Sequence, residues 1–111
     1  MKKKTINISR DFSPYPAGRY KNDGKYTGEG FRDNFLKKAL KNNDVVTVEL
    51  DGTLGYGSSF LEEAFGGLVR EDNFTEEDLS KKLILEGNRK SITESIWGYI
   101  HDAQLQKNSN K

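Results

Sequence analysis

The residues best placed for chemistry lie at a polar, glycine-rich corner between a strand-like run and a helix-like run. The corner reads Asp51-Gly52-Thr53-Leu54-Gly55-Tyr56-Gly57-Ser58-Ser59. The first amides of a helix lack intrahelical partners and carry partial positive charge. Two serines at such a position could hold a phosphate, carry one covalently, or simply cap the helix. The function of the chain depends on which of these roles applies.

Three catalytic motifs partly match the sequence of the corner, but in each case the corner lacks a residue that the motif requires. The phosphate loop G-x-x-x-x-G-K-[ST] has Ser58 at its lysine position. In the dinucleotide fingerprint G-x-G-x-x-G, Phe60 occupies the position of the third glycine. In the hydrolase elbow G-x-S-x-G, Leu61 occupies the position of the final glycine. The only histidine, His101, lies near the chain end, far from the corner in sequence. We therefore expect neither an enzyme nor a cofactor.

The serines also fit a structural role. Ser59-Phe60-Leu61-Glu62 reads S-x-x-E, the pattern of a capping box between Ser59 and Glu62. We predict this role for Ser59, where it would contribute about 1 kcal/mol. A phosphate on Ser58, in the first helical turn, would gain from the helix dipole. Glu62 and Glu63 are adjacent and diverge around a helix, so we expect no metal site there.

A second candidate surface is the glycine-rich loop from Asp11 to Gly28, which interleaves aromatic and cationic side chains. They are Tyr15, Arg19, Tyr20, Lys21, Lys25 and Tyr26, with Arg32 following. Such a loop suits a protein interface, or single-stranded nucleic acid whose bases stack on the rings. Alternatively, the loop folds back and buries Tyr20 or Tyr26 over the sheet. The balanced net charge makes nucleic acid the least favoured of the three.

Alternating strand and helix patterns must position these residues. Three short segments are expected as strands: residues 6–8, where apolar and polar residues alternate, and the apolar-rich runs at 45–50 and 83–85. Helical spacing marks three others: residues 31–40, 60–69 and 91–103. A further short helix is expected at 75–79, where Thr75 would cap the first turn and carboxylates follow it. We predict an α/β fold in which three or four helices cover a small mixed β-sheet.

Length and composition indicate the number of domains, the kind of partner and the cellular location. The 111 residues suit one domain, expected at 5–105, between a basic tail at 1–4 and a disordered tail at 106–111. Lys and Arg number 18 against 17 Asp and Glu, a balance that argues against strong nucleic-acid binding. The sequence has no cysteine, signal-peptide pattern or membrane span, so we expect a cytoplasmic protein.

Several short motifs in these segments match a known group. They are Gly18-Arg19, Asp23-Gly24, Thr27-Gly28-Glu29 with Phe31-Arg32, Glu49-Leu50-Asp51-Gly52, and Ser58-Ser59-Phe60-Leu61-Glu62-Glu63-Ala64-Phe65-Gly66. In these motifs the chain resembles STAS domains, the fold of anti-sigma factor antagonists. It resembles more closely the bacterial and phage STAS-like family of unknown function.

The resemblance implies a STAS-like α/β fold and a role in partner switching. In STAS regulators a strand ends in Asp-Ser-Ser-Gly, and a partner kinase that is also the anti-sigma factor phosphorylates the first serine. Ser58 takes that place here, while Gly57 replaces the aspartate and Phe60 replaces the glycine. The resemblance also implies a histidine-kinase-type ATPase as the natural partner.

We therefore expect a non-enzymatic regulatory module that binds a protein partner, with Ser58 as the candidate phosphoacceptor. The expected contact residues are Arg19, Tyr20, Tyr26, Arg32, Asp51, Tyr56, Gly57, Ser58 and Ser59. One alternative is a small-ligand or nucleotide pocket built from the loop, the corner, and Arg19 or Arg32. The other is single-stranded nucleic-acid binding through the loop. Each of these readings is compatible with an oligomer, and none involves a membrane.

Overall fold

Three short strands form the sheet of the computed structural model, which describes residues 1–109. They are β1 (Lys3–Asn7), β2 (Val45–Glu49) and β3 (Leu83–Glu86), in the order β1-β2-β3. Both pairings are parallel, because a helical crossover separates each strand from the next. The α/β class is confirmed, and within it the pairing is parallel where a mixed sheet was expected.

Two long helices with continuous backbones supply much of the core. The first joins α1 (Gly28–Phe31) to α2 (Lys37–Asn42) through a π-helical turn, and we call it the α1–α2 helix. The second joins α3 (Ser58–Leu61) to α4 (Gly67–Arg70) in the same way, and we call it the α3–α4 helix. Both helices occur where apolar residues recur at helical spacing, so these predictions are confirmed.

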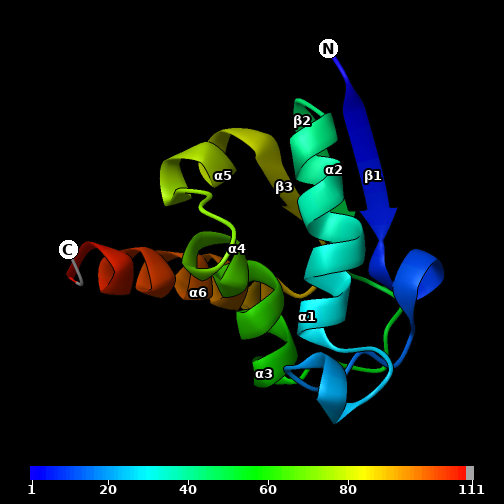
Figure 1. Ribbon diagram of the computed structural model, residues 1–111. Coiled ribbons are helices and arrows are strands. Elements are labelled where there is room, and N and C mark those ends of the chain that lie inside the picture. The colour runs from blue at the N-terminus through cyan, green and yellow to red at the C-terminus, as the bar shows by residue number, and fades with distance from the viewer. Residues whose placement is uncertain (110–111) are drawn as a thin grey trace.

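The other α-helices are α5 (Glu76–Lys82) and α6 (Lys90–Ser109), as Figure 1 shows, and two short helical turns, a π-helix (Ile8–Phe12) and a 3-10 helix (Lys21–Asp23), precede α1. Thr75 caps α5, as predicted, because its hydroxyl accepts the Asp78 amide at 3.0 Å. The helix α6 continues to Ser109, so residues 106–109 are helical where a disordered tail was expected. The last two residues of that expected tail, Asn110 and Lys111, lie outside the described residues. None of the described helices is long and apolar enough to cross a bilayer.

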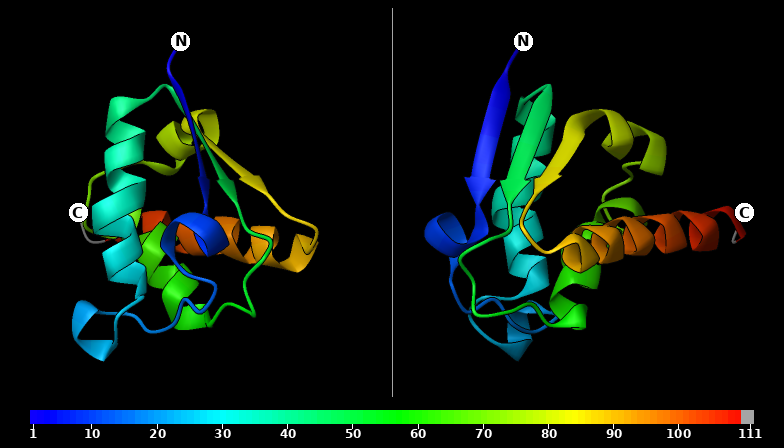
Figure 2. Two further views of the ribbon diagram at one scale, coloured as in Figure 1. Left: turned by 90° about the vertical axis from the view of Figure 1, so that its right-hand side faces the viewer. Right: turned by 180° about the vertical axis from the view of Figure 1, so that it is seen from behind.

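One face of the sheet meets the helices, and alternation along the strands decides which residues face them. Ile6, Val46, Val48 and Leu83 are buried on this face. The opposite face is turned away from the α1–α2 helix, and Figure 2 shows the strands in front of that helix when the molecule is seen from behind.

A cluster of phenylalanines joins the two long helices. Phe31 lies 6.0 Å from Phe60 and 6.5 Å from Phe65 between ring centroids. The helices can approach because Gly28 has no side chain: a Cβ there would lie 2.5 Å from the Phe60 carbonyl oxygen. This contact fixes the start of the α3–α4 helix, and with it the predicted corner, beside the loop that precedes α1.

Candidate functional site

Within the corner predicted to carry chemistry, residues 51–59, residues 51–57 form a loop closed at its base, and Ser58 and Ser59 begin α3. The Tyr56 hydroxyl donates a hydrogen bond to the Leu50 carbonyl at 2.6 Å. Burial raises the pKa of Tyr56, so its hydroxyl keeps the proton that this bond needs. The Asp51 carboxylate accepts the Asn88 amide at 3.0 Å, which ties the corner to the segment after β3. Asp51 and Tyr56, both expected to contact a partner, therefore also hold the corner in shape.

The middle of the corner is fixed to the segment that follows β1. The Ser9 hydroxyl donates to the Gly52 carbonyl at 2.9 Å, and Gly52 has the left-handed φ of +100° that favours glycine. The Leu54 amide donates to the Pro14 carbonyl at 3.1 Å, which sets Leu54 close to Tyr15. Leu54 is 81% exposed and Tyr15 is 64% exposed. The corner thus presents two apolar side chains on an anchored backbone.

The helix after the corner begins without the predicted capping box. Gly57 is the N-cap residue, and within residues 1–109 no side chain accepts a hydrogen bond at this cap. Ser58 and Ser59 are both exposed. The capping prediction for Ser59 is wrong because the Glu62 carboxylate is bound by two arginines instead. A charge-assisted pair with a guanidinium is stronger than a bond to a neutral amide.

Those arginines belong to a charged cluster beneath the helix start. We call it the arginine–glutamate cluster, and its members are Arg19, Arg32, Glu62, Glu63 and Arg70. Arg70 Nη1 lies 2.7 Å from Glu62 Oε2, and Arg70 Nη2 lies 3.1 Å from Glu63 Oε1. Arg19 contacts both glutamates, with its Nη1 3.3 Å from Glu63 Oε1. The cluster therefore connects the glycine-rich loop to the α3–α4 helix.

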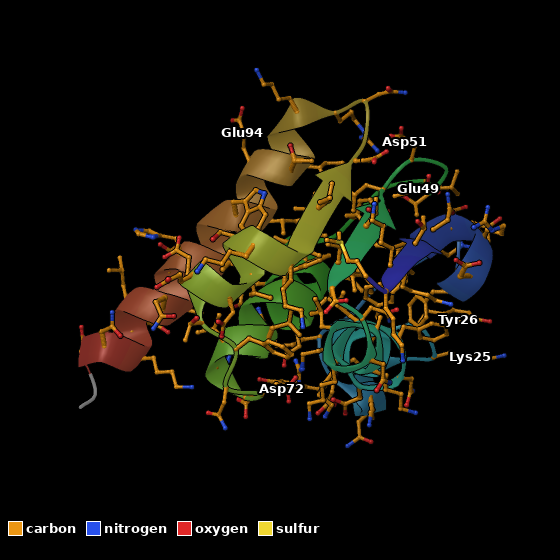
Figure 3. The ribbon with its side chains drawn as sticks, turned by 90° about the horizontal axis from the view of Figure 1, so that it is seen from above. Lys25, Tyr26, Glu49, Asp51, Asp72 and Glu94 are labelled. Atoms are coloured by element: carbon orange, nitrogen blue, oxygen red, sulfur yellow. The ribbon has the colours of Figure 1, made fainter. Side chains whose placement is uncertain are left out.

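Arg32 and Glu63 are the most buried members of this cluster, and each is only 3% exposed. Arg32 is the cation of this pair. Its Nη1 lies 2.5 Å from Glu63 Oε2 and 2.7 Å from the Glu63 carbonyl oxygen. Its Nε lies 3.1 Å from Asp72 Oδ2, and Figure 3 shows Asp72 between the two long helices. A guanidinium held this way does not reach the surface. This geometry corrects the expectation that Arg32 contacts a ligand or partner.

The electrostatics of Glu62 follow from the same contacts. Burial raises the pKa of the Glu62 carboxyl, but hydrogen bonds and charge from Arg70 and Arg19 outweigh it and hold the pKa below the ordinary range. Glu62 is therefore ionised at neutral pH and stays paired with both arginines. The contact role expected of Arg19 stays a prediction, although its guanidinium is directed into the cluster.

The two tyrosines of the glycine-rich loop have different surroundings. Tyr26 is half-buried and packs edge-on against Phe12, with ring centroids 5.6 Å apart. Lys25 Nζ lies 5.5 Å from the centre of the Tyr26 ring. Tyr20 is 54% exposed. The loop thus folds back at Tyr26, as one of the alternatives stated, while Tyr20 remains at the surface.

The structure brings together residues that sequence reasoning did not single out. Glu63 and Arg70 complete the arginine–glutamate cluster, and Leu54 forms the most exposed part of the corner. One signal was present in the sequence: Arg70 follows Glu62 by two helical turns, close enough for a long side chain to return. The pairing of Arg19 had no local signal, because it joins residues 43 positions apart.

The exposed residues at one end of the molecule form what we call the corner surface. It consists of Tyr15, Leu54, Gly57, Ser58 and Ser59. It combines two apolar side chains with two hydroxyl groups at the start of a helix. A surface of this composition suits a protein partner, since aromatic and aliphatic anchors with a polar rim are typical of such interfaces.

A separate hollow of about 330 Å³ lies at the carboxyl ends of the strands. Ligands of parallel sheets commonly bind at this edge. The lining is acidic and amide-rich: Asn7, Glu49, Asp51, Glu86, Gly87 and Asn88. Figure 3 shows Glu49 and Asp51 near the end of β2. Carboxylates repel phosphates, and the arginines expected to bind a nucleotide are in the arginine–glutamate cluster, so this hollow differs from the pocket that the sequence suggested.

Comparison with known protein families identifies a family for this chain. A family model described as "STAS-like domain of unknown function (DUF4325)" matches residues 27–93. The chain belongs to this STAS-like family. The matched part of the STAS-like domain includes both long helices, the corner and the strands β2 and β3. The resemblance inferred from the sequence motifs is thus confirmed. No curated protein and no solved structure matches the chain.

Proposed function

We propose that this STAS-like domain is a non-enzymatic regulatory module that binds a protein partner through the corner surface. The observation that carries the proposal is the exposure of Leu54 on an anchored loop. Single exposed leucines are common on protein surfaces. The backbone amide of Leu54, however, is hydrogen-bonded to the Pro14 carbonyl. Hydrogen bonds made by Tyr56 and Asp51 also hold the base of the loop. Binding to a rigid loop loses little conformational entropy.

Ser58 supplies a way to regulate that contact. Its side chain is exposed at the start of a helix that continues to Arg70. A phosphate there would add about two negative charges beside the apolar part of the corner surface. The helix dipole would stabilise the phosphorylated form, while the desolvation of that charge would oppose burial of the surface by a partner. Phosphorylation would therefore change partner affinity.

The kinase in this proposal is a histidine-kinase-type ATPase, which is also the binding partner. The reaction transfers the γ-phosphoryl group of ATP to the Ser58 hydroxyl oxygen and releases ADP. The hydroxyl proton passes to a base of the kinase. The STAS-like domain supplies only the acceptor and the docking surface, which agrees with the incomplete catalytic motifs of the corner.

Binding can be tested with an ATPase of this type from the same organism, by isothermal titration calorimetry. Replacing Leu54 by Asp places a charge at the centre of the contact, so we expect at least about a tenfold loss of affinity. Leu105→Asp is the matched control, because Leu105 is also exposed, at 51%, but lies on α6. Equal binding by wild type and the Leu54 variant would contradict the proposed surface.

Phosphorylation has a separate test by intact-mass measurement after incubation with the ATPase and ATP. We expect the wild-type domain and Ser59→Ala to gain the mass of one phosphate, and Ser58→Ala to gain none. The neighbouring serine serves as the control, because both serines are exposed at the same helix start. A mass gain that survives in Ser58→Ala, or no gain in the wild type, would exclude Ser58 as the acceptor.

A further inference from the structure

The face of the sheet that points away from the long helices is open. Among residues 1–109, no helix lies across this face, as Figure 2 shows from behind. Its central row is Thr5, Thr47 and Ile84, which are register neighbours on β1, β2 and β3. All three side chains are β-branched and uncharged, and Ile84 is 47% exposed. Parallel sheets are usually covered on both faces, so a row of this kind favours a covering partner.

Charge changes sign along the strands of this open face. At the amino ends, Lys3 is the register neighbour of Val45. At the carboxyl ends, Asn7, Glu49 and Glu86 form the corresponding row. The face therefore runs from a basic end, through an uncharged middle, to an acidic end.

Such a pattern is complementary to itself when one copy is reversed. A two-fold axis that lies between two facing sheets, perpendicular to their strands, sets the basic end of each copy over the acidic end of the other. The uncharged rows then meet at the axis, about 10 Å apart between backbones. Any arrangement that keeps the strands parallel would instead set like charges together.

We infer that the open sheet face is the interface of a homodimer, in which two STAS-like domains pack face to face with their strands antiparallel. In this arrangement Thr47 lies at the two-fold axis. Each strand then lies over the same strand of the other copy, so Lys3 lies over Asn7 of the other copy, and Glu49 on the adjacent strand is the nearest carboxylate of the acidic row. Within its own chain Glu49 accepts a hydrogen bond from Asn7 Nδ2 at 3.2 Å, which directs it across this face. Arg10 and Asp11, which form an ion pair, follow β1 beside this row, and Asp51 lines the same hollow as Glu49 and Glu86.

The size of the face sets the expected strength. Three strands of four or five residues each offer less area than a standard interface. The dimer should therefore be weak and depend on protein concentration. Its ionic ends should make it weaker in high salt, because exposed charge pairs are screened. The corner surface uses other residues, so dimer formation and partner binding can be separated.

Sedimentation velocity of the full chain over about 10 µM to 1 mM tests the inference directly. We expect wild type to shift from monomer to dimer across this range. Ile84→Asp should remain monomeric, because two carboxylates would be buried near the axis. The matched control Leu105→Asp should dimerise like wild type, since Leu105 has similar exposure on α6. A wild type that stays monomeric throughout, or an Ile84→Asp variant that dimerises unchanged, would overturn the inference.

A charge-reversal cycle tests the orientation. Lys3→Glu and Glu49→Lys should each weaken the dimer, and the double variant should restore it to near the wild-type association constant. A general loss of folding cannot produce such a recovery. Failure of the double variant to recover, with circular dichroism showing folded protein, would contradict the antiparallel arrangement. Leu54→Asp serves as a further control: it should leave dimerisation unchanged, so failure of the partner proposal would not affect this result.

Discussion

At the scale of single residues, the buried ion pair of Arg32 and Glu63 joins the two long helices. Both side chains are only 4% exposed, so neither charge can be compensated by water. Arg32 also donates to the Glu63 carbonyl, which binds the α1–α2 helix to the backbone of the α3–α4 helix. The arginine–glutamate cluster thus stabilises the fold of the domain. The exposed serines at the start of the α3–α4 helix are the residues that remain accessible for regulation.

Replacing Arg32 by Met should be strongly destabilising, because Glu63 would lose its closest cation in a buried position. We expect a loss of about 3 to 5 kcal/mol in the free energy of unfolding, measured by urea denaturation. Arg10→Met is the control: it removes the ion pair of Arg10 with Asp11 in an exposed position and should leave the midpoint unchanged. A similar midpoint for both variants would contradict the structural role of the buried pair.

The lowered pKa of Glu62 makes part of the stability depend on pH. A carboxyl with a lowered pKa in the folded state stabilises fully above its ordinary value of about 4.5, and this stabilisation is lost as pH falls through the lowered pKa. We therefore expect the urea midpoint of wild type to fall as the pH drops below about 4.5, and that of Glu62→Gln to fall less. If the urea midpoint of Glu62→Gln falls with pH as steeply as that of wild type, protonation of Glu62 is not the source of this pH dependence.

At the scale of elements, the two helix starts with capping sequences behave differently. Thr75 forms the box with Asp78, while Ser59 does not form one with Glu62. Local sequence gave both the same prediction, because the pattern of an acceptor followed by an acidic residue is shared. The difference arises from two arginines: Arg19, distant in the chain, and Arg70, on the same helix, bind Glu62. Asp78 has no arginine among its contacts in the described part of the chain.

This difference can be measured by thermal denaturation of two alanine variants. Thr75→Ala should lose about 1 kcal/mol, the usual contribution of a threonine cap. Ser59→Ala should change stability by less than about 0.5 kcal/mol, as expected of a surface position without such a bond. Equal losses would mean that Ser59 caps its helix after all.

At the scale of the whole molecule, the glycine-rich loop is held against the helices at several points. The Gly28 amide donates to the Gly18 carbonyl at 3.0 Å, and the Glu29 amide donates to the Arg19 carbonyl at 3.0 Å. The Arg19 side chain adds a contact with Glu62 and Glu63 on the α3–α4 helix. A loop that the composition suggested as a free binding surface is therefore attached to the core through Arg19 and Tyr26.

Hydrogen–deuterium exchange should show this attachment. Arg19→Ala removes the side-chain contact, so we expect faster exchange in residues 14–26 and unchanged exchange in the strands. Arg10→Ala changes an arginine whose side chain is 69% exposed and serves as the control. Unchanged exchange in the loop of the Arg19 variant would show that the backbone hydrogen bonds alone hold it.

The sequence by itself located most strands and α-helices and indicated the family of this protein. The first strand is the exception, because β1 begins at Lys3, inside the basic tail expected at residues 1–4, and ends at Asn7. Hydrophobic periodicity depends only on local spacing, and it located the strands β2 and β3 and the long helices near their observed bounds. The motifs around Ser58 indicated the STAS-like family, which the match over residues 27–93 confirms. The exposure of both serines is compatible with the role proposed for Ser58 but came from the structure.

Only the tertiary structure decided the direction of the strands and the partners of the charged residues. Parallel pairing depends on how the crossovers return, and the spacing of apolar residues within a strand carries no such information. The pairing of Arg19 with Glu62 joins positions far apart in the chain, so it displaced a capping box that local sequence favoured. The long-range contacts prevailed because a partly buried carboxylate is stabilised more by two guanidinium groups than by one backbone amide.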